Sequence, residues 1–188
     1  MRQFASSGFR IWNLGREAKL VYSGFGLFAL LAIASSVLFY EDLVGPKTAG
    51  VGGYYANEAR VSHEPAAATG GGPNIELPSE APQRIVVPVT YRKLLEVTHF
   101  HLFTVPVFLL IIAHLFMLTG LSARAKTVWI AGGWLSSLLH LAAPWLIHYG
   151  SASLGWLFPL SGALMALTLS VMTGYPIVVM WIHKEKAA

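Results

Sequence analysis

Five histidines lie in or at the ends of long apolar segments of this chain: His99, His101, His114, His140 and His148. An ionisable side chain inside a bilayer is costly unless it has a partner, so such residues mark candidate functional sites. A neutral imidazole is also a strong ligand for metal ions and for haem iron. The histidines therefore indicate either a bound redox cofactor or hydrogen bonds between membrane helices.

The depth of each histidine limits which of them can bind the same iron. At a rise of ~1.5 Å per residue, counted from the outer ends of their segments, His99 lies about 5 Å deep and His101 about 8 Å deep. On the next segment His148 lies about 3 Å deep and His140 about 15 Å deep, whereas His114 lies about 27 Å deep. His148 therefore matches His99 or His101 in depth. His140 matches His101 only with about one turn of offset, and it differs from His114 by about 12 Å.

Rotation about the helix axis gives a second criterion. On an ideal helix His99 and His114 are about 60° apart, and His140 and His148 are about 80° apart. His101 is about 140° from His114 and is expected to project elsewhere. The predicted shared face carries His99, His114, His140 and His148. We keep all five histidines as candidate cofactor ligands and assign a haem iron first to His99 and His148.

The sequence also limits the kind of cofactor. The chain has no cysteine, which excludes covalent c-type haem, so any haem must be bound non-covalently. For copper or another metal the closest pattern is Glu96-x-x-His99-x-His101. A helix places the last two about 200° apart, which disfavours a mononuclear site. Haem ligation, another metal and interhelical hydrogen bonding remain the three alternatives.

The segments that carry these histidines have the composition of membrane helices. Only 12% of the 188 residues are charged, against roughly 25% in soluble domains. Leu20 to Tyr40, Val97 to Ala123 and Val128 to Ile182 contain no Asp, Glu, Lys or Arg, and the third run is long enough for two crossings. A crossing needs about 20 apolar residues. The predicted fold is an all-α membrane protein with four transmembrane helices, at 20–40, 97–121, 128–149 and 155–181.

The basic residues predict how the chain crosses the membrane. They precede the first helix, separate the second from the third, and follow the fourth: Arg2, Arg10, Arg16, Lys19, Arg124, Lys126, Lys184 and Lys186. The positive-inside rule places these segments in the cytoplasm, with both termini inside. We expect a multi-pass protein of the inner (cytoplasmic) membrane, with lipid as a partner. The net charge of +4 is then a topology signal and does not indicate nucleic-acid binding.

The expected organisation has five parts. A basic N-terminal segment (1–19) precedes the first helix (20–40), and a bundle of three helices (96–183) precedes a short cytoplasmic tail (184–188). The extracytoplasmic loop between them (41–95) is rich in Gly, Pro and Ala from Gly45 to Pro82. Loops of this length are usually functional or disordered. It is either a spacer or, as we favour, an arm that lies along a partner, with a short extended segment from Arg84 to Tyr91.

The histidines, the small-residue helices and the topology resemble those of the four-helix membrane subunits of b-type cytochromes. The resemblance covers about 100 residues and implies one or two b-type haems. It also implies electron transfer between the quinone pool and an extracytoplasmic partner, such as a cytochrome, within a larger redox complex. His101 and His114, 13 residues apart, fit the ligand spacing of di-haem members. His140 and His148 are only eight apart, which departs from that pattern.

Three functions follow as hypotheses. The first is an electron-transfer subunit that binds b-type haem through transmembrane histidines, more a part of an oxidoreductase complex than an enzyme alone. The alternative is a cofactor-free anchor or assembly subunit of a multi-subunit membrane complex. A small-molecule or metal channel has less support, because a single four-helix chain would have to oligomerise to enclose a pore.

Overall fold

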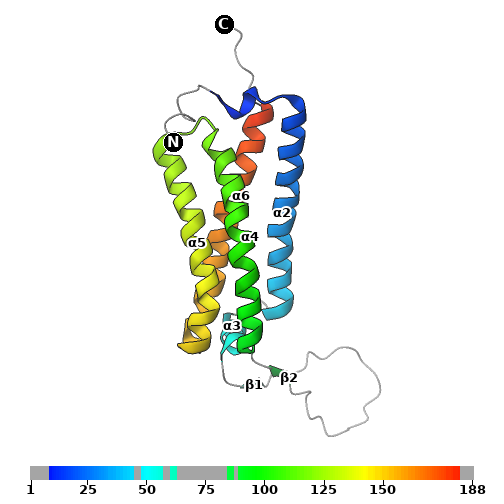
Figure 1. Ribbon diagram of the computed structural model, residues 1–188. Coiled ribbons are helices and arrows are strands. Elements are labelled where there is room, and N and C mark those ends of the chain that lie inside the picture. The colour runs from blue at the N-terminus through cyan, green and yellow to red at the C-terminus, as the bar shows by residue number, and fades with distance from the viewer. Residues whose placement is uncertain (1–8, 45–47, 57–59, 63–83, 87–88, 183–188) are drawn as a thin grey trace, which may run out of the picture.

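The computed structural model describes residues 9–44, 48–56, 60–62, 84–86 and 89–182. Four long helices run side by side: α2 (Arg16–Val44), α4 (Tyr91–Met117), α5 (Ala123–Tyr149) and α6 (Leu157–Ile182) (Figure 1). Each is long and apolar enough to cross a membrane. The prediction of an all-α, four-helix, multi-pass membrane protein is confirmed. The predicted cytoplasmic tail (184–188), His63 and much of the Gly/Pro/Ala-rich loop lie outside the described residues.

Three helices begin earlier than their apolar segments do: α2, α4 and α5. Helix α4 starts at Tyr91, after Thr90 accepts a hydrogen bond from the backbone of Lys93. Helix α5 starts at Ala123, after Ser122 accepts one from the backbone of Ala125. A side-chain oxygen at this position satisfies an amide that has no partner within the helix. The charged first turns are therefore helical, although a search for uncharged runs leaves them out.

Short helices and strands lie at the two ends of the bundle. The 3-10 helix η1 (Ile11–Asn13) lies near the start of α2, and residues 9 and 182 lie at the same end, as four crossings require (Figure 1). We call this the inner end. Helix α3 (Thr48–Tyr55) and the 3-10 helix η2 (Ala152–Trp156) meet at the opposite, outer end. Strands β1 (Arg60–Ser62) and β2 (Arg84–Val86) form an antiparallel pair there, with Arg60 opposite Val86.

The most tightly filled part of the bundle is its inner half. A cluster of buried side chains from α4 and α6 fills it: Leu109, Ile112, Ala113, Phe116, Leu169 and Met172. Helix α5 closes against this cluster at Gly133, where a Cβ atom would lie 3.3 Å from both Leu109 Cδ2 and Met172 Sδ. Many large apolar side chains point outward instead, which suits a bilayer environment.

Polar side chains set the register between neighbouring helices. Trp145 of α5 donates an Nε1 hydrogen bond to Thr98 Oγ1 of α4 at 2.8 Å. Trp181 of α6 donates one to Ser23 Oγ of α2 at 2.9 Å. Helix α2 packs mainly along α6 and touches α4 through Phe25 on Phe108, with ring centroids 5.9 Å apart.

Candidate cofactor site

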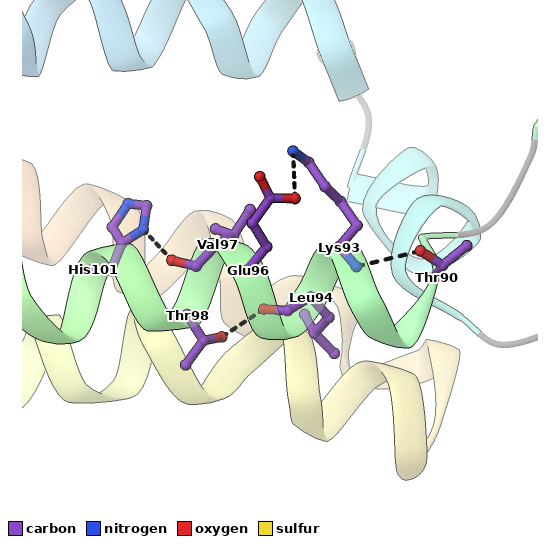
Figure 2. Close-up of polar contacts among 7 residues, drawn as sticks. All are labelled: Thr90, Lys93, Leu94, Glu96, Val97, Thr98 and His101. Atoms are coloured by element: carbon purple, nitrogen blue, oxygen red, sulfur yellow. Dashed lines mark hydrogen bonds and ion pairs between the residues drawn. The ribbon is translucent and has the colours of Figure 1, made fainter.

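His101 lies on the inward-facing stripe of α4. The stripe runs at steps of three or four residues through Leu94, Thr98, His101, Val105 and Leu109, a spacing that keeps side chains on one helix face. Leu94 and Leu109 are buried, but the His101 side chain is exposed. His101 therefore lies at the exposed edge of this stripe, on the side of α4 that carries Glu96 (Figure 2). By its spacing His101 lies about 140° from His114 and so on a different face of α4, which is what the sequence leads us to expect.

His101 and His140 lie at the same depth. Leu109 of α4 stands opposite Gly133 of α5. His101 is eight residues outward of Leu109 and His140 is seven residues outward of Gly133, so the two differ in depth by about 1.5 Å. His101 is also near enough to act electrostatically on His140. The offset of one turn expected between them is absent, because α4 extends outward to Tyr91.

His140 is held against α6 by three contacts. Its Nδ1 lies 3.1 Å from Ser161 Oγ, and its ring lies 4.4 Å, centroid to centroid, from that of Phe158. At Gly162 a Cβ atom would come within 3.2 Å of His140 Cε1, so glycine leaves the space that the imidazole occupies. The ring is half-buried, and its orientation is fixed from the α6 side.

The hydrogen bonds around Ser161 define which nitrogen of His140 carries the proton. Ser161 Oγ lies 3.0 Å from the carbonyl oxygen of Phe158 and donates to it. A hydroxyl has a single hydrogen, so Ser161 must accept from Nδ1–H of His140. In the neutral ring Nε2 is then the nitrogen with the free lone pair, the state in which imidazole binds iron.

His101 reaches the same state through its own helix. Its Nδ1 lies 2.7 Å from the carbonyl oxygen of Val97, which can only accept, so Nδ1 carries the hydrogen (Figure 2). A metal-binding histidine almost always donates its other N–H to a carbonyl, a carboxylate or water. Both imidazoles therefore have the hydrogen-bond arrangement that a ligand to haem iron requires.

The remaining three histidines are placed differently. His99 is exposed, with its ring 5.1 Å from that of Phe103, and His114 is exposed near the inner end, its Nδ1 2.8 Å from Leu110 O. These two do share a face, as their spacing predicts, but it is the outward face of α4. Rotation within one helix compares residues only with each other, so it could not show which face meets the bundle.

His148 has a structural partner at the outer end. Its ring is buried, and Nδ1 donates to the backbone carbonyl of Tyr55 in α3 at 2.9 Å. It lies fifteen residues outward of Gly133 and is therefore level with Leu94, about 8 Å outward of His99. The structure does not bring His99 and His148, the pair first assigned to iron, together.

The pattern Glu96-x-x-His99-x-His101 is not assembled into a metal site. Glu96 instead forms an ion pair with Lys93 at 3.3 Å on the surface of α4 (Figure 2). Across the part of the chain that the structure describes, no three His, Cys, Asp or Glu side chains come together. A mononuclear zinc or copper site requires at least that number of protein ligands. A haem iron can be held by two imidazoles.

A small cavity lies beside His101 at the seam of α4 and α5. Its volume is about 30 Å³ and its lining includes Val105, Pro106, Trp134 and Ser137. Ser137 is buried, and its Oγ has no hydrogen-bond partner in the structure. A buried hydroxyl without a partner is unusual, which indicates that this seam is incompletely satisfied by the chain itself. Sequence reasoning missed Ser137 and Ser161, because serine in an apolar helix gives no pattern of its own.

Comparison with protein families gives one match. A family model described as a transmembrane helical domain matches residues 45–187, which includes all five helical histidines. Comparisons with curated proteins and with solved structures find no match.

Proposed function

Since the chain belongs to this Aq_1264_TM family of transmembrane helical domains, we propose that it is a membrane-embedded electron-transfer subunit that binds b-type haem between His101 and His140. The observation that supports the proposal is the common depth of these two imidazoles, which are near enough to act on each other electrostatically. They come from antiparallel helices at the same depth, and each has Nδ1 engaged as a donor, which leaves Nε2 for iron. His99, His114 and His148 are not needed as ligands.

The surroundings of the pair suit a flat apolar group. Gly162 leaves space beside His140, and His101 is exposed between the half-buried Thr98 and Val105. The unpartnered hydroxyl of Ser137 lies at the same seam. A bound haem would supply a one-electron carrier there. Val97 and Ser161 would fix the orientation of the two histidine ligands, and apolar side chains would exclude water. Hydrogen bonding to the ligands and burial are the main ways in which a protein tunes the redox potential of such a centre.

The position of the pair favours one haem in the outer half of the bundle. His101 lies ten residues from the start of α4, about 15 Å along the axis. The inner half is filled by the Leu109, Ile112 and Phe116 cluster, which supports a single site. In the proposed setting of the cytoplasmic membrane, the outer half faces the extracytoplasmic side. An extracytoplasmic cytochrome or the quinone pool is then the redox partner, within a complex of several subunits.

The test is an absorption spectrum of the protein purified in detergent from a haem-replete host, recorded before and after reduction. We expect a b-type spectrum that His101→Ala abolishes. Because the His101 side chain is exposed, its removal should not unfold the protein, so a lost spectrum would report lost haem binding. His140→Ala should abolish it too. His114→Ala is the matched control on the same helix and should leave the spectrum intact. A colourless wild-type protein, or a spectrum that survives His101→Ala, rules the assignment out.

A second candidate is a cofactor-free anchor or assembly subunit. It is supported by the hydrogen bond from His148 to Tyr55, which ties α3 to α5, and by the contact of the Tyr55 ring with Phe158 at 5.1 Å. An outer element fastened in this way suits a platform for a partner subunit. A colourless protein that still copurifies with redox subunits would favour this function over the first.

A further inference from the structure

The inner end of the bundle holds two cations side by side. Lys126 donates from Nζ to the carbonyl oxygen of Met117 at 2.6 Å, and Arg10 donates from Nη1 to the carbonyl oxygen of Thr119 at 3.4 Å. The accepting residues are two apart: Met117 ends α4, and Thr119 lies in the turn that leads to α5. The two side chains are close enough to repel each other electrostatically. Like charges held together disfavour each other, and an anion beside them would favour both charged forms.

The chain does not provide that anion within its described residues. At the inner end they include five basic side chains, Arg10, Arg16, Lys19, Arg124 and Lys126, and one carboxylate, Glu17. The single ion pair among all the described residues joins Lys93 to Glu96, and it lies at the outer end. An arginine has five N–H donors and a lysine three. Each cation therefore retains donors beyond the one that it gives to a carbonyl oxygen.

The segment that carries Arg10 is firmly placed. Ile11 is fully buried, and its backbone N–H donates to the carbonyl oxygen of Leu118 at 3.2 Å. The ring of Trp12 lies against Gly120, within 3.5 Å of where a Cβ atom would be. The N-terminal segment thus docks on the α4–α5 turn. Arg10 is held beside Lys126 by this packing, so the cation pair is a feature of the fold.

From these contacts we infer that Arg10 and Lys126 bind the phosphate group of an anionic phospholipid. A guanidinium fork and an ammonium group are the usual ligands of phosphate oxygens. The pair lies where the apolar helices end, which is the level of lipid headgroups. Met117 and Val128, both exposed and apolar, lie on the adjoining helix ends, where acyl chains would run. The inference does not depend on haem binding.

The experiment measures lipid binding by the full chain in detergent, by native mass spectrometry and thermal stability. Phosphatidylglycerol, phosphatidylcholine and inorganic phosphate are the three probes. We expect preferential binding of phosphatidylglycerol, and roughly thirtyfold weaker binding by Arg10→Gln/Lys126→Gln, since each cation near an anionic surface contributes about fivefold. Arg92→Gln/Lys93→Gln is the matched control, because it removes the same charge from the outer end of α4.

Three results would overturn the inference. The first is equal binding of the two lipids, and the second is an equal loss of lipid binding in the control double variant. The third is stabilisation by inorganic phosphate as large as that by phosphatidylglycerol, which would assign the site to free phosphate. Should the double variant fail to fold, Arg10→Gln alone keeps the hydrogen bond of Lys126 to Met117 and should weaken binding about fivefold. A single variant that folds and binds the lipid as tightly as the wild type would also contradict it.

Discussion

Ser161 accepts a hydrogen bond from His140 because its own hydrogen goes to a backbone carbonyl. The two side chains come from adjacent helices, α5 and α6, and their Nδ1 and Oγ atoms are 3.1 Å apart. The carbonyl oxygen of Phe158, 3.0 Å from Oγ, takes the hydroxyl hydrogen. A backbone group of α6 thereby decides the tautomer of a histidine on α5, and this gives His140 a lone pair at Nε2.

Replacing Ser161 should change the chemistry of His140 more than the fold. In Ser161→Ala the Nδ1–H loses the hydroxyl as its acceptor, and we expect haem affinity about 10- to 100-fold lower, the usual effect of losing such a partner. Histidine ¹⁵N NMR of the haem-free protein should show a mixture of tautomers in place of Nδ1–H alone. Ser161→Thr keeps the hydroxyl and should restore both properties. An unchanged ¹⁵N spectrum in Ser161→Ala contradicts the hydrogen-bond direction, whether or not haem binds.

Adding a methyl group at Gly162 should displace His140. The new Cβ would lie 3.2 Å from Cε1 of the imidazole, inside ordinary contact distance. We expect Gly162→Ala to destabilise the protein by about 1 kcal/mol or more, as small overpacking changes do, and to weaken haem binding.

Gly174→Ala is the matched control for that change, because the same helix leaves open space around its Cβ position. Its higher helix propensity should make it neutral or stabilising by up to about 1 kcal/mol. Thermal unfolding in detergent compares the two variants, and equal effects would show that the Gly162 site can relax freely.

Removing the donor of His148 should release α3 from the bundle. In His148→Phe the ring volume is nearly retained, but the carbonyl oxygen of Tyr55 loses a 2.9 Å hydrogen bond. Leaving such a group unsatisfied costs about 1–3 kcal/mol. Hydrogen exchange should therefore accelerate at the end of α3, for example at the amide of Ala56 just after the helix, which is bonded to the Gly52 carbonyl oxygen. His99→Phe, at an exposed position, should leave this exchange rate unchanged. If exchange accelerated equally in His99→Phe, the effect in His148→Phe would reflect a general loss of stability and not the lost hydrogen bond to Tyr55.

The docking of α3 should also weaken at alkaline pH. Burial raises the pKa of the Tyr55 phenol well above its usual value of 10.0, and the neighbouring Tyr54 and Tyr40 add to the effect. The folded state thus holds this proton more tightly than the unfolded state, so its stabilising contribution is complete below pH 10 and falls as the pH rises further. Thermal unfolding between pH 9 and 11.5 should show this decline. Tyr55→Phe should flatten it, and an equally steep decline in that variant would assign the effect to other groups.

Much of the fold could be predicted from composition. Uncharged runs of sufficient length identified four membrane helices, and their even number placed both ends of the described chain on one side. The starts of α4 and α5 were missed by several residues because their first turns are charged, as with Arg92 and Lys93. Those turns are helical through the caps at Thr90 and Ser122, which depend on local hydrogen bonds and not on hydropathy.

The sequence by itself determined that this protein crosses the membrane and which residues could bind iron, because both depend only on residue type and on runs along the chain. Only the tertiary structure decided that His101 lies level with His140, that His148 serves α3, and that His99 and His114 face outward. Depth and rotation are properties of one helix relative to another. Here they are set by contacts such as Leu109 on Gly133 and Trp145 to Thr98, which no single segment encodes.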